Sequence, residues 1–333
     1  MRTQLKGSVV VVTGASSGIG RATALEMARR GAHVALLARR RGPLEELGRE
    51  CERLTPGVRA LVLPTDTTDE TAVKAAAHAA VNELGRLDVW VNAAAVLAAS
   101  RFVDTPPRVF RRVVDVNLMG YVHGALAALT HFVQRGRGVI INVASVESVL
   151  PFPYFSAYGA SKHAVRGFTR SLRQELEHLG HTGIRVREVL PATIDTPLFE
   201  HAANYTGRAL RAMPPIYPPE RVARAIVELA EDPSARDRVV GQAGRVMRVM
   251  LAVAPRLGER LLARACDREH LEQAAVDEST PGNLFEPLPQ GTEASGGWRD
   301  ATRAQRRRRL VRAAALAAAV ALPVAVGAMA LRA

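Results

Sequence analysis

The stretch "SVVVVTGASSGIGRATALEMARRGAHVALLARR", residues 8–40, contains three patterns in succession. A β-branched apolar run leads into a glycine-rich turn, then into apolar residues at helical spacing, and finally into a second apolar run. Short continuous apolar runs are typical of strands that are buried on both faces, and helical spacing between two of them indicates a crossover helix. The stretch therefore predicts a strand, a tight turn, a helix and a second, parallel strand.

The same alternation continues along the chain. Further apolar runs are "RALVLPTDTTD" at 59–69, "LDVWVNAAAV" at 87–96, "GVIINVAS" at 138–145 and "GIRVREVLPATIDTP" at 183–197, with helical patterns between them. Such alternation predicts an α/β fold: a doubly wound, Rossmann-like parallel sheet with helices on both faces. Ligands of these sheets bind at the carboxyl ends of the strands.

Composition divides the chain into four parts. We expect a single catalytic domain over 1–235, a basic amphipathic helical extension over 236–275, and a flexible linker over 276–300, which is rich in Pro, Gly and Ser. An Arg-rich segment and a hydrophobic tail follow over 301–333. The fold class is therefore one α/β domain with a helical C-terminal extension and a hydrophobic tail.

Composition also excludes several classes of protein. The chain has 333 residues with an apolar fraction of 48%, which suffices for a sizeable core. Its net charge is +13, but arginine is spread along the whole chain and aromatics are not interleaved with it, so we expect no nucleic-acid partner. Cys51 and Cys266 are too few for a disulfide framework, which favours a reducing compartment. No secretory signal and no metal-ligand spacing among the nine histidines is recognisable.

The turn "TGASSGIG", residues 13–20, has the composition of a phosphate-binding loop. Gly14, Gly18 and Gly20 lack β-carbons, so the backbone can approach a pyrophosphate, and the first free N–H groups of the following helix face its charge. The strand–turn–helix context makes this pattern more specific than glycines alone.

With these residues, the sequence resembles the short-chain dehydrogenase/reductase family over roughly residues 5–235. The resemblance implies a set of cofactor-binding residues: Thr13, Gly14, Ser16, Ser17, Gly18, Ile19, Gly20, Asp66, Thr67, Asn92, Tyr158, Lys162 and Thr196. The chain departs from the family pattern at Ala93, Ala95 and Ala192, where the family usually has Asn, Gly and Gly. Ala95 would crowd the cofactor if its backbone needed a positive φ.

The end of the second predicted strand chooses between NAD(H) and NADP(H). An acidic residue there would bind the ribose 2′-hydroxyl and repel a 2′-phosphate. The chain has "LLARRR" at 36–41, with no carboxylate. We therefore expect NADP(H), with Arg39 and Arg40, helped by Ser16, binding the phosphate through charge-assisted hydrogen bonds. The alternative is that these arginines are solvated residues at the start of a helix.

The reactive residues are predicted from "YGASK", residues 158–162. Reduction of a ketone needs an acid beside the carbonyl, and a nearby cation lowers the pKa of a tyrosine. Tyr158 and Lys162 lie one helical turn apart, so the ammonium can act on the phenol and bind the nicotinamide ribose. The resemblance implies that Ser145 polarises the carbonyl and that Asn117 holds a water leading to the lysine. Structural alternatives are a helix cap for Ser145 and a helix kink for Asn117.

We therefore expect an NADP(H)-dependent oxidoreductase that transfers a hydride between nicotinamide and a carbonyl or secondary alcohol, with Tyr158 as the general acid or base and no metal. Two alternatives remain: a catalytically silent nucleotide-binding sensor or scaffold of the same fold, and a nucleotide-sugar epimerase. A variable substrate lid is expected over 197–219, with candidate contacts at Phe199, His201, Tyr205, Arg208 and Met213.

The C-terminal region suggests a membrane. Residues 313–331 are uncharged and close to the length that spans a bilayer, and "RRRR" at 306–309 precedes them. The basic amphipathic segment 245–264 suits an anionic surface. We expect a cytoplasmic catalytic domain that associates with the membrane through its tail, forms a homo-oligomer and takes a small, lipophilic carbonyl or alcohol substrate. The alternatives are that the tail is an Ala-rich helix packed in a dimer and that the basic segment is a charged helix covering the core.

Overall fold

The structure is a computed structural model that describes residues 4–150, 152–242 and 253–302. The chain divides into a large unit, Met1–Gly296, and a small one that begins at Gly297. Within the small unit, residues 298–302 are helical. The fold and the candidate site both belong to the large unit.

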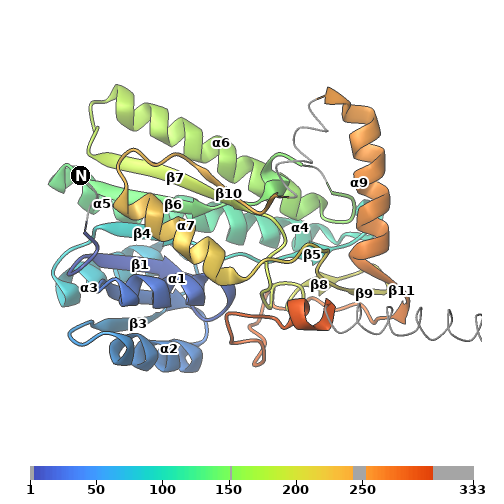
Figure 1. The fold of residues 1–333 in the computed structure, drawn as a ribbon, viewed down its shortest axis with the longest axis horizontal. Helices are drawn as coiled ribbons and strands as arrows, with labels where there is room; N and C mark the ends of the chain where they lie inside the picture. Colours follow the sequence, from blue (N-terminus) through green and yellow to red (C-terminus); the bar gives the residue numbers. More distant parts are fainter. Residues whose placement is uncertain (1–3, 151, 243–252, 303–333) are drawn as a thin grey trace, which may run out of the picture. The chain divides into compact units, whose positions relative to one another are not determined.

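A seven-stranded parallel sheet forms the centre of the large unit, in the order β10-β7-β6-β4-β1-β2-β3. The sheet is doubly wound, as predicted, because the order reverses direction between β1 and β4 (Figure 1). The strands are β1 (Val9–Thr13), β2 (His33–Ala38), β3 (Ala60–Pro64), β4 (Val89–Asn92), β6 (Gly138–Val143), β7 (Ile184–Pro191) and β10 (Arg238–Val240).

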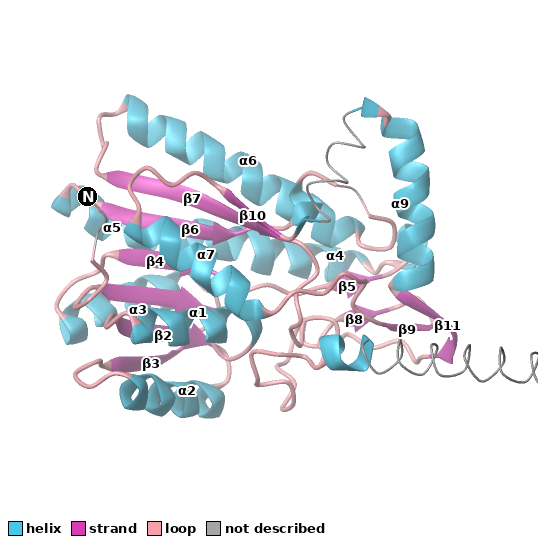
Figure 2. Cartoon of the chain, viewed as in Figure 1, coloured by secondary structure: helices cyan, strands magenta, loops and turns pink. Residues whose placement is uncertain are grey.

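Helices cover both faces of this sheet (Figure 2). One face packs against α1 (Gly18–Arg29), α2 (Arg41–Leu54) and α7 (Pro219–Glu231), and the other against α3 (Glu70–Leu84), α5 (Gly120–Arg135) and α6 (Ser156–His178). Buried Val and Ile of the strands point alternately into these two apolar cores, which explains why the strands read as continuous apolar runs.

The helix that carries Asn117 is interrupted. α4 (Pro107–Val114) runs into a π-helical turn, Asp115–Met119, which continues as α5. Among the described residues, Pro107–Arg135 is the one helix whose length and hydropathy would permit a membrane span, but half of its most apolar window is buried in the protein. The predicted C-terminal membrane helix lies outside the described residues.

Beyond residue 235 the fold differs from the predicted boundaries. Residues 238–240 form β10, which joins the sheet beside β7, so the domain continues past 235. The predicted extension contains one described helix, α9 (Pro255–Glu269), and a strand, β11 (Leu271–Val276), which pairs with β9 (Arg208–Leu210). A third small pairing joins β5 (Ala98–Ala99) to β8 (Ala203–Asn204).

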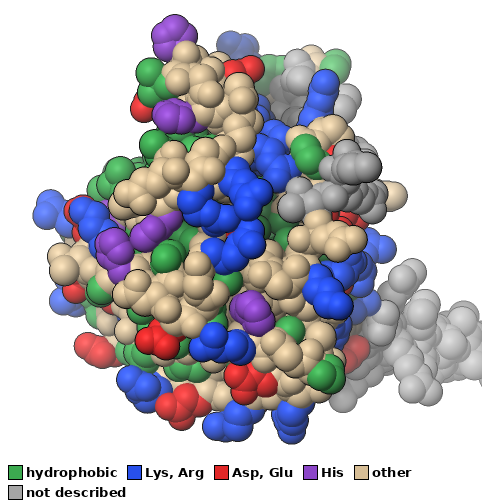
Figure 3. All heavy atoms as spheres, turned by 90° about the vertical axis from the view of Figure 1, so that its left-hand side faces the viewer, with side chains coloured by type: hydrophobic (Ala, Val, Ile, Leu, Met, Phe, Trp, Pro, Cys, Tyr) green, Lys and Arg blue, Asp and Glu red, His purple; other side chains and the backbone are tan. Residues whose placement is uncertain are grey.

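Figure 3 shows the side on which the strands begin, where Lys and Arg side chains gather in a band across the middle. Ion pairs are also formed where β4 begins. Arg86 and Arg135 both form ion pairs with Asp88, the residue before β4, at 2.7 and 3.2 Å. The candidate site lies at the opposite end of the strands.

Candidate active site

A cavity of about 220 Å³ lies at the carboxyl ends of the strands. Most predicted site residues line it: Gly14, Ser16, Ser17, Gly18, Ile19, Gly20, Arg39, Arg40, Asp66, Thr67, Ser145, Tyr158, Lys162 and Thr196. Three predicted residues, Thr13, Asn92 and Asn117, do not line it. The sheet therefore brings the glycine turn, the two arginines and the Tyr–Lys pair to a single cavity.

The glycine turn passes very close to the end of β4. Gly14 has φ +68°, and a β-carbon on it would lie 2.7 Å from Cα of Ala94, so only glycine fits there. Gly18, at φ +56°, begins α1, and a β-carbon on it would lie 3.3 Å from Thr196. The start of α1 thus presents its backbone to the cavity, as an anion site requires.

Thr13 and the residues after β4 hold each other in place. The Thr13 hydroxyl oxygen accepts hydrogen bonds from the backbone N–H groups of Ala93 and Ala94, at 3.0 and 3.2 Å. Ala95 does not adopt a positive φ; among the described non-glycine residues only Tyr154 does. The alanine that replaces the usual glycine is therefore accommodated without backbone strain.

Asn92 and Asn117 act inside the protein. The Asn92 amide donates to the Asn142 side chain and to the backbone carbonyl of Tyr121, and its oxygen accepts from the Trp90 indole. Asn117, in the π-helical turn, exchanges two hydrogen bonds with the backbone of Val96. Both side chains are fully buried and neither lines the cavity, but Asn117 holds the backbone of Val96, which does.

Lys162 and Tyr158 project from the first turns of α6 into the cavity. The Lys162 ammonium donates to the carbonyl of Val143 at 2.9 Å and to the Tyr121 hydroxyl at 3.3 Å. It lies 5.5 Å from the centre of the Tyr158 ring. Ser145 follows β6, where its hydroxyl accepts a hydrogen bond from the N–H of Glu147. The predicted capping role and the predicted place in the site are therefore compatible.

Burial is the largest cause of the pKa shifts of Lys162 and Tyr158. It lowers the pKa of Lys162 to about 7, and Glu147 opposes this shift. Burial and then the charge of Glu147 raise the pKa of Tyr158 above its ordinary value, whereas hydrogen bonding with Ser145 lowers it. The sequence argument expected Lys162 to lower the pKa of Tyr158; the structure differs because desolvation of the phenol outweighs the distant, itself desolvated ammonium.

Glu147 is a cavity residue that the sequence analysis missed. It lies two residues after Ser145 and lines the same cavity. The residue is half-buried, and its Oε2 atom is buried with no hydrogen-bond partner among the described residues. Burial raises its pKa to about 8, although Lys162 pulls it down. In the sequence, the signal that could have identified Glu147 is an acidic residue two positions after the predicted serine, Ser145.

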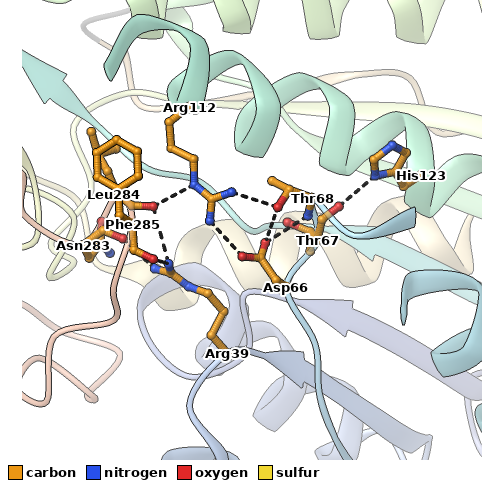
Figure 4. Close-up of polar contacts among 9 residues, drawn as sticks. All are labelled: Arg39, Asp66, Thr67, Thr68, Arg112, His123, Asn283, Leu284 and Phe285. Atoms are coloured by element: carbon orange, nitrogen blue, oxygen red, sulfur yellow. Dashed lines mark hydrogen bonds and ion pairs between the residues drawn. The ribbon is translucent and has the colours of Figure 1, made fainter. Parts of the chain in front are cut away.

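At the other end of the cavity, Asp66 is held by neighbours from two elements (Figure 4). Its carboxylate accepts hydrogen bonds from Thr68 and from the Arg112 guanidinium of α4, at 2.8 Å to the latter. Burial alone would raise the pKa of Asp66, but these hydrogen bonds outweigh it and lower the pKa. Thr67 accepts a hydrogen bond at its carbonyl from His123. Arg112 is a second residue that sequence reasoning missed.

Arg39 and Arg40 contact a segment for which the sequence predicted a flexible linker. Residues 283–293, here called the strap, cross this end of the cavity. Arg39 donates to the carbonyls of Asn283, Leu284 and Phe285 (Figure 4), and Arg40 to those of Leu288, Gln290 and Gly291. Because arginine supplies five donors in a fixed fork, several carbonyls of one extended segment can satisfy it. The strap is thus a wall of the cavity.

The third part of the cavity is aromatic. Phe152, Phe155 and Phe199 surround the ring of His270, with ring centres 5.2 to 6.2 Å apart, and all four residues line the cavity. The predicted lid residues Phe199 and His201 reach the cavity, whereas Tyr205, Arg208 and Met213 do not. His270 comes from the C-terminal region, which sequence reasoning could not place near α6.

His270 is a neutral imidazole that donates a hydrogen bond through Nδ1 and can accept one at Nε2. Its Nδ1 lies 2.9 Å from the carbonyl oxygen of Arg211, and since a carbonyl can only accept, Nδ1 carries the proton. Burial lowers its pKa to about 4. The other ring nitrogen is therefore unprotonated at neutral pH. Within the described ranges no group of three or more His, Cys, Asp or Glu could hold a metal ion.

These features fit a nicotinamide dinucleotide. A glycine turn at a helix start, two arginines at the end of the second strand, and a buried Tyr–Lys pair lie along a single cavity at the point where the strand order reverses. Fold and site together define a dinucleotide-binding oxidoreductase.

Comparisons with known proteins give the family. The family model "short chain dehydrogenase" matches residues 8–205. The oxidoreductase YxnA of Bacillus subtilis is 38% identical over 265 residues, which cover 78% of this chain and 73% of YxnA. A 3beta-hydroxysteroid dehydrogenase 1 of Eggerthella lenta is 38% identical over 240 residues, covering 70% and 90%. The chain belongs to the short-chain dehydrogenase family.

Solved structures agree with this assignment. A short-chain dehydrogenase from Mycobacterium paratuberculosis bound to NAD has a TM-score of 0.62 at 27% identity, and covers 72% of this chain and 97% of its own. A short-chain type dehydrogenase/reductase from Mycobacterium marinum has a TM-score of 0.63 at 30% identity, covering 71% and 94%. The chain is thus an oxidoreductase that uses a nicotinamide cofactor to transfer a hydride.

Proposed function

We propose that this oxidoreductase uses NADP(H) and acts on a carbonyl or secondary alcohol, with Tyr158 as the general acid or base. The observation that supports the proposal best is the shared cavity, which Arg39 and Arg40 line at one end and Ser145, Tyr158 and Lys162 at the other. A bound nicotinamide would supply or accept the hydride at the Tyr158 end.

Individual residues of this chain polarise the carbonyl, transfer the proton and bind the cofactor phosphate. Ser145 donates a hydrogen bond to the substrate carbonyl oxygen, which stabilises the negative charge that develops there. Tyr158 gives that oxygen its proton during reduction and takes it back during oxidation. Lys162, with a pKa of about 7, is in part an ammonium at neutral pH and stabilises the phenolate left behind. Arg39 and Arg40 bind the 2′-phosphate of the cofactor.

The apolar part of the cavity supports a lipophilic substrate. Phe152, Phe155 and Phe199 form three of its walls, and such surfaces bind apolar rings or chains. The name of the Eggerthella lenta relative, a 3beta-hydroxysteroid dehydrogenase, points in the same direction. We therefore propose substrates with a bulky apolar body.

The deciding experiment compares NADPH with NADH in an absorbance assay with a panel of hydrophobic ketones. Replacing Tyr158 by Phe should reduce kcat by about 10²- to 10⁴-fold, the usual contribution of a positioned acid or base. The matched control is Tyr205→Phe, a half-buried tyrosine outside the cavity, which should keep its activity. Full activity of Tyr158→Phe, or a preference for NADH, would contradict the corresponding part of the proposal.

Membrane association through the C-terminal region and a homo-oligomeric state are also proposed. The membrane proposal rests on the sequence of residues 245–264 and 313–331, most of which lie outside the described residues. Fractionation of the full chain and of a version that ends at Gly297 tests the tail. Equal recovery of both versions in the soluble fraction would rule out the anchor.

A further inference from the structure

Glu147 has a buried carboxyl oxygen that lacks a hydrogen-bond partner in the described part of the chain, which is rare in proteins. The residue as a whole is half-buried, but its Oε2 atom is buried and meets no donor among the described residues. A buried polar atom without a hydrogen bond costs about 1–3 kcal/mol, so a protein seldom retains one that has no use. The N–H of Glu147 bonds Ser145, which leaves the carboxyl as its only unexplained group.

Glu147 shares its cavity with the residues that are proposed to act on the carbonyl. It lines the cavity with Ser145 and Tyr158, and its charge acts on both Tyr158 and Lys162. It also acts on Cys266 of α9, which packs with Phe155 and lies four residues before His270. Glu147 therefore shares one cavity with both the reactive group and the aromatic walls.

We propose that Glu147 selects the substrate by accepting a hydrogen bond from a hydroxyl group that the substrate carries next to its reacting carbonyl. The aromatic walls, Phe152, Phe155 and Phe199, then hold the apolar body. The substrate class is thus an α-hydroxy ketone with an apolar ring or chain, or the corresponding diol. This inference rests on the proposed function, because it assumes that the carbonyl binds between Ser145 and Tyr158.

Both protonation states of Glu147 serve this purpose. A neutral carboxyl keeps one carbonyl oxygen as an acceptor, and a carboxylate has two. An apolar substrate without a hydroxyl would leave the carboxyl without a hydrogen-bond partner. The free-energy cost of that unsatisfied group would weaken binding of this substrate and not of the hydroxy ketone. Discrimination therefore comes from the cost of leaving a buried polar group unsatisfied.

A matched pair of ketones tests the inference: 2-hydroxyacetophenone and propiophenone, which differ in a hydroxyl against a methyl group. The wild-type chain should prefer the hydroxy ketone by about tenfold or more in kcat/KM, and Glu147→Met should remove the preference. Glu147→Gln, whose amide oxygen still accepts, should retain most of it. Equal kcat/KM values in the wild type, or a preference that survives Glu147→Met, would overturn the inference.

Two further readouts separate this inference from the proposed function. Calorimetric titration of both ketones into the enzyme with NADP⁺ detects the preference even without turnover, so absent turnover would count against the proposed function alone. A thermal melt tests a structural role. Glu147→Met should melt at the same or a higher temperature, because an unpaired buried carboxyl is removed. A lowered melting temperature would contradict the role in substrate selection.

A second inference concerns the strap, residues 283–293. Its carbonyls take the donors that a dinucleotide phosphate would need. The N–H of Gly18, at the start of α1, donates to the carbonyl of Glu293 at 2.9 Å, and Arg39 and Arg40 donate to six carbonyls between 283 and 291. In the proposed cofactor site, the Gly18 N–H would bind the pyrophosphate, and Arg39 and Arg40 would bind the 2′-phosphate.

The strap is anchored at both ends by the segment that follows β7. At one end, the N–H of Asn283 donates to the carbonyl of His201. At the other, Ser295 donates to the Asp195 carboxylate at 2.9 Å, just beyond the strap. Between them, Nε2 of His201 lies 3.1 Å from the carbonyl oxygen of Gln290. The strap is therefore held in place by contacts with the segment 195–201.

We propose that the strap competes with the cofactor for these phosphate sites, so that cofactor binding and release of the strap are coupled. An N–H group that donates to Glu293 cannot at the same time donate to a pyrophosphate. The coupling is reciprocal: whatever loosens the strap tightens cofactor binding, and cofactor binding loosens the strap. The inference rests on the proposed cofactor site.

Glycine substitutions can loosen the strap without touching the arginines. Gly291 has φ +64°, and a β-carbon there would collide with Nε2 of His201; next to the strap, Gly282, at φ +52°, would collide with the carbonyl of His201. Gly57→Ala is the matched control, since Gly57 has φ +84° but open space around it. In the full chain, Gly291→Ala and Gly282→Ala should each lower the Kd for NADPH by about tenfold. Gly57→Ala should leave it unchanged.

A protease experiment tests the reciprocal effect on the wild-type chain. A glutamate-specific protease should cut after Glu286 and Glu293 faster when NADPH is present, because the cofactor displaces the strap. Slower cutting would show that the strap closes over the cofactor and would overturn the competition. Unchanged or weaker NADPH binding by the glycine variants would also overturn it. If neither wild type nor variants bind NADPH, the proposed cofactor is wrong as well.

Discussion

The ammonium of Lys162 lies 2.9 Å from the backbone carbonyl oxygen of Val143, the last residue of β6. This contact connects the helix that carries Tyr158 to the strand that leads to Ser145. The ammonium is also 5.0 Å above the Tyr121 ring, and the side chain is only 1% exposed. A compact cation with three donors fits this enclosure, whereas a planar guanidinium does not.

Lys162→Arg should therefore reduce kcat about 100-fold, although it conserves charge. The larger fork cannot occupy the same enclosed position, so the charge moves away from Tyr158. Steady-state kinetics with NADPH and an accepted ketone measure the loss. Lys74→Arg, at an exposed position on α3, is the control and should keep its activity. Near-normal turnover of Lys162→Arg would contradict the assigned role.

Asn92 should prove to be a structural residue. Asn92→Ala leaves the Trp90 indole N–H and the Asn142 amide oxygen without their partner inside the sheet. The expected loss is about 2–4 kcal/mol of the free energy of unfolding, from two unsatisfied groups. Urea denaturation measures it. The KM for NADPH should change little; a raised KM with unchanged stability would instead support the predicted cofactor contact.

Arg39→Ala should weaken NADPH binding by about 10- to 100-fold and leave NADH binding equal or tighter. NADPH binding weakens because the substitution removes a charge-assisted partner of the 2′-phosphate. NADH binding does not weaken because the substitution also removes the contacts that hold the strap. Fluorescence titration with both cofactors measures the two Kd values. Arg41→Ala, an exposed arginine outside the cavity, is the control. Equal weakening of both cofactors would contradict a role in phosphate selection.

Glu147 should make the wild-type fold less stable as the pH rises. Its pKa is about 8 in the folded chain against an ordinary 4.5, so the folded state binds the extra proton between these values. Stability from this group is therefore full below pH 4.5 and is lost as the pH approaches 8. Glu147→Met removes this loss. Its advantage in the free energy of unfolding should be larger at pH 8 than at pH 5 by at least ~1.4 kcal/mol, equivalent to one pKa unit. Urea curves at both pH values test this, and an advantage that does not grow would contradict the buried, raised carboxyl.

Local patterns were sufficient to predict the sheet, the glycine turn and the Tyr158–Lys162 pair, and the family resemblance added Ser145 to the same cavity. Each depends on residues close together in the sequence or on the rule that parallel strands end at one edge. Asn92 and Asn117 were assigned by resemblance, and the structure buries both outside the cavity lining.

The features that sequence reasoning missed depend on distant parts of the chain. The strap is held through its backbone carbonyls, which every residue has, so its Pro- and Gly-rich composition resembles a mobile linker. His270 reaches the aromatic wall only because β11 pairs with β9. Desolvation, which sets the pKa of Tyr158, likewise depends on the whole enclosure and not on the spacing of Tyr158 and Lys162.

The π-helical turn at Asp115–Met119 fixes the rotational register of α4 against α5. An α-helix turns by about 100° per residue, so deleting one residue there would regularise the helix and rotate α4 by roughly that angle. Arg112 would then point away from Asp66 and from the carbonyl of Leu284. One additional residue in a helix thus decides whether Arg112 can bond both Asp66, which follows β3, and the strap.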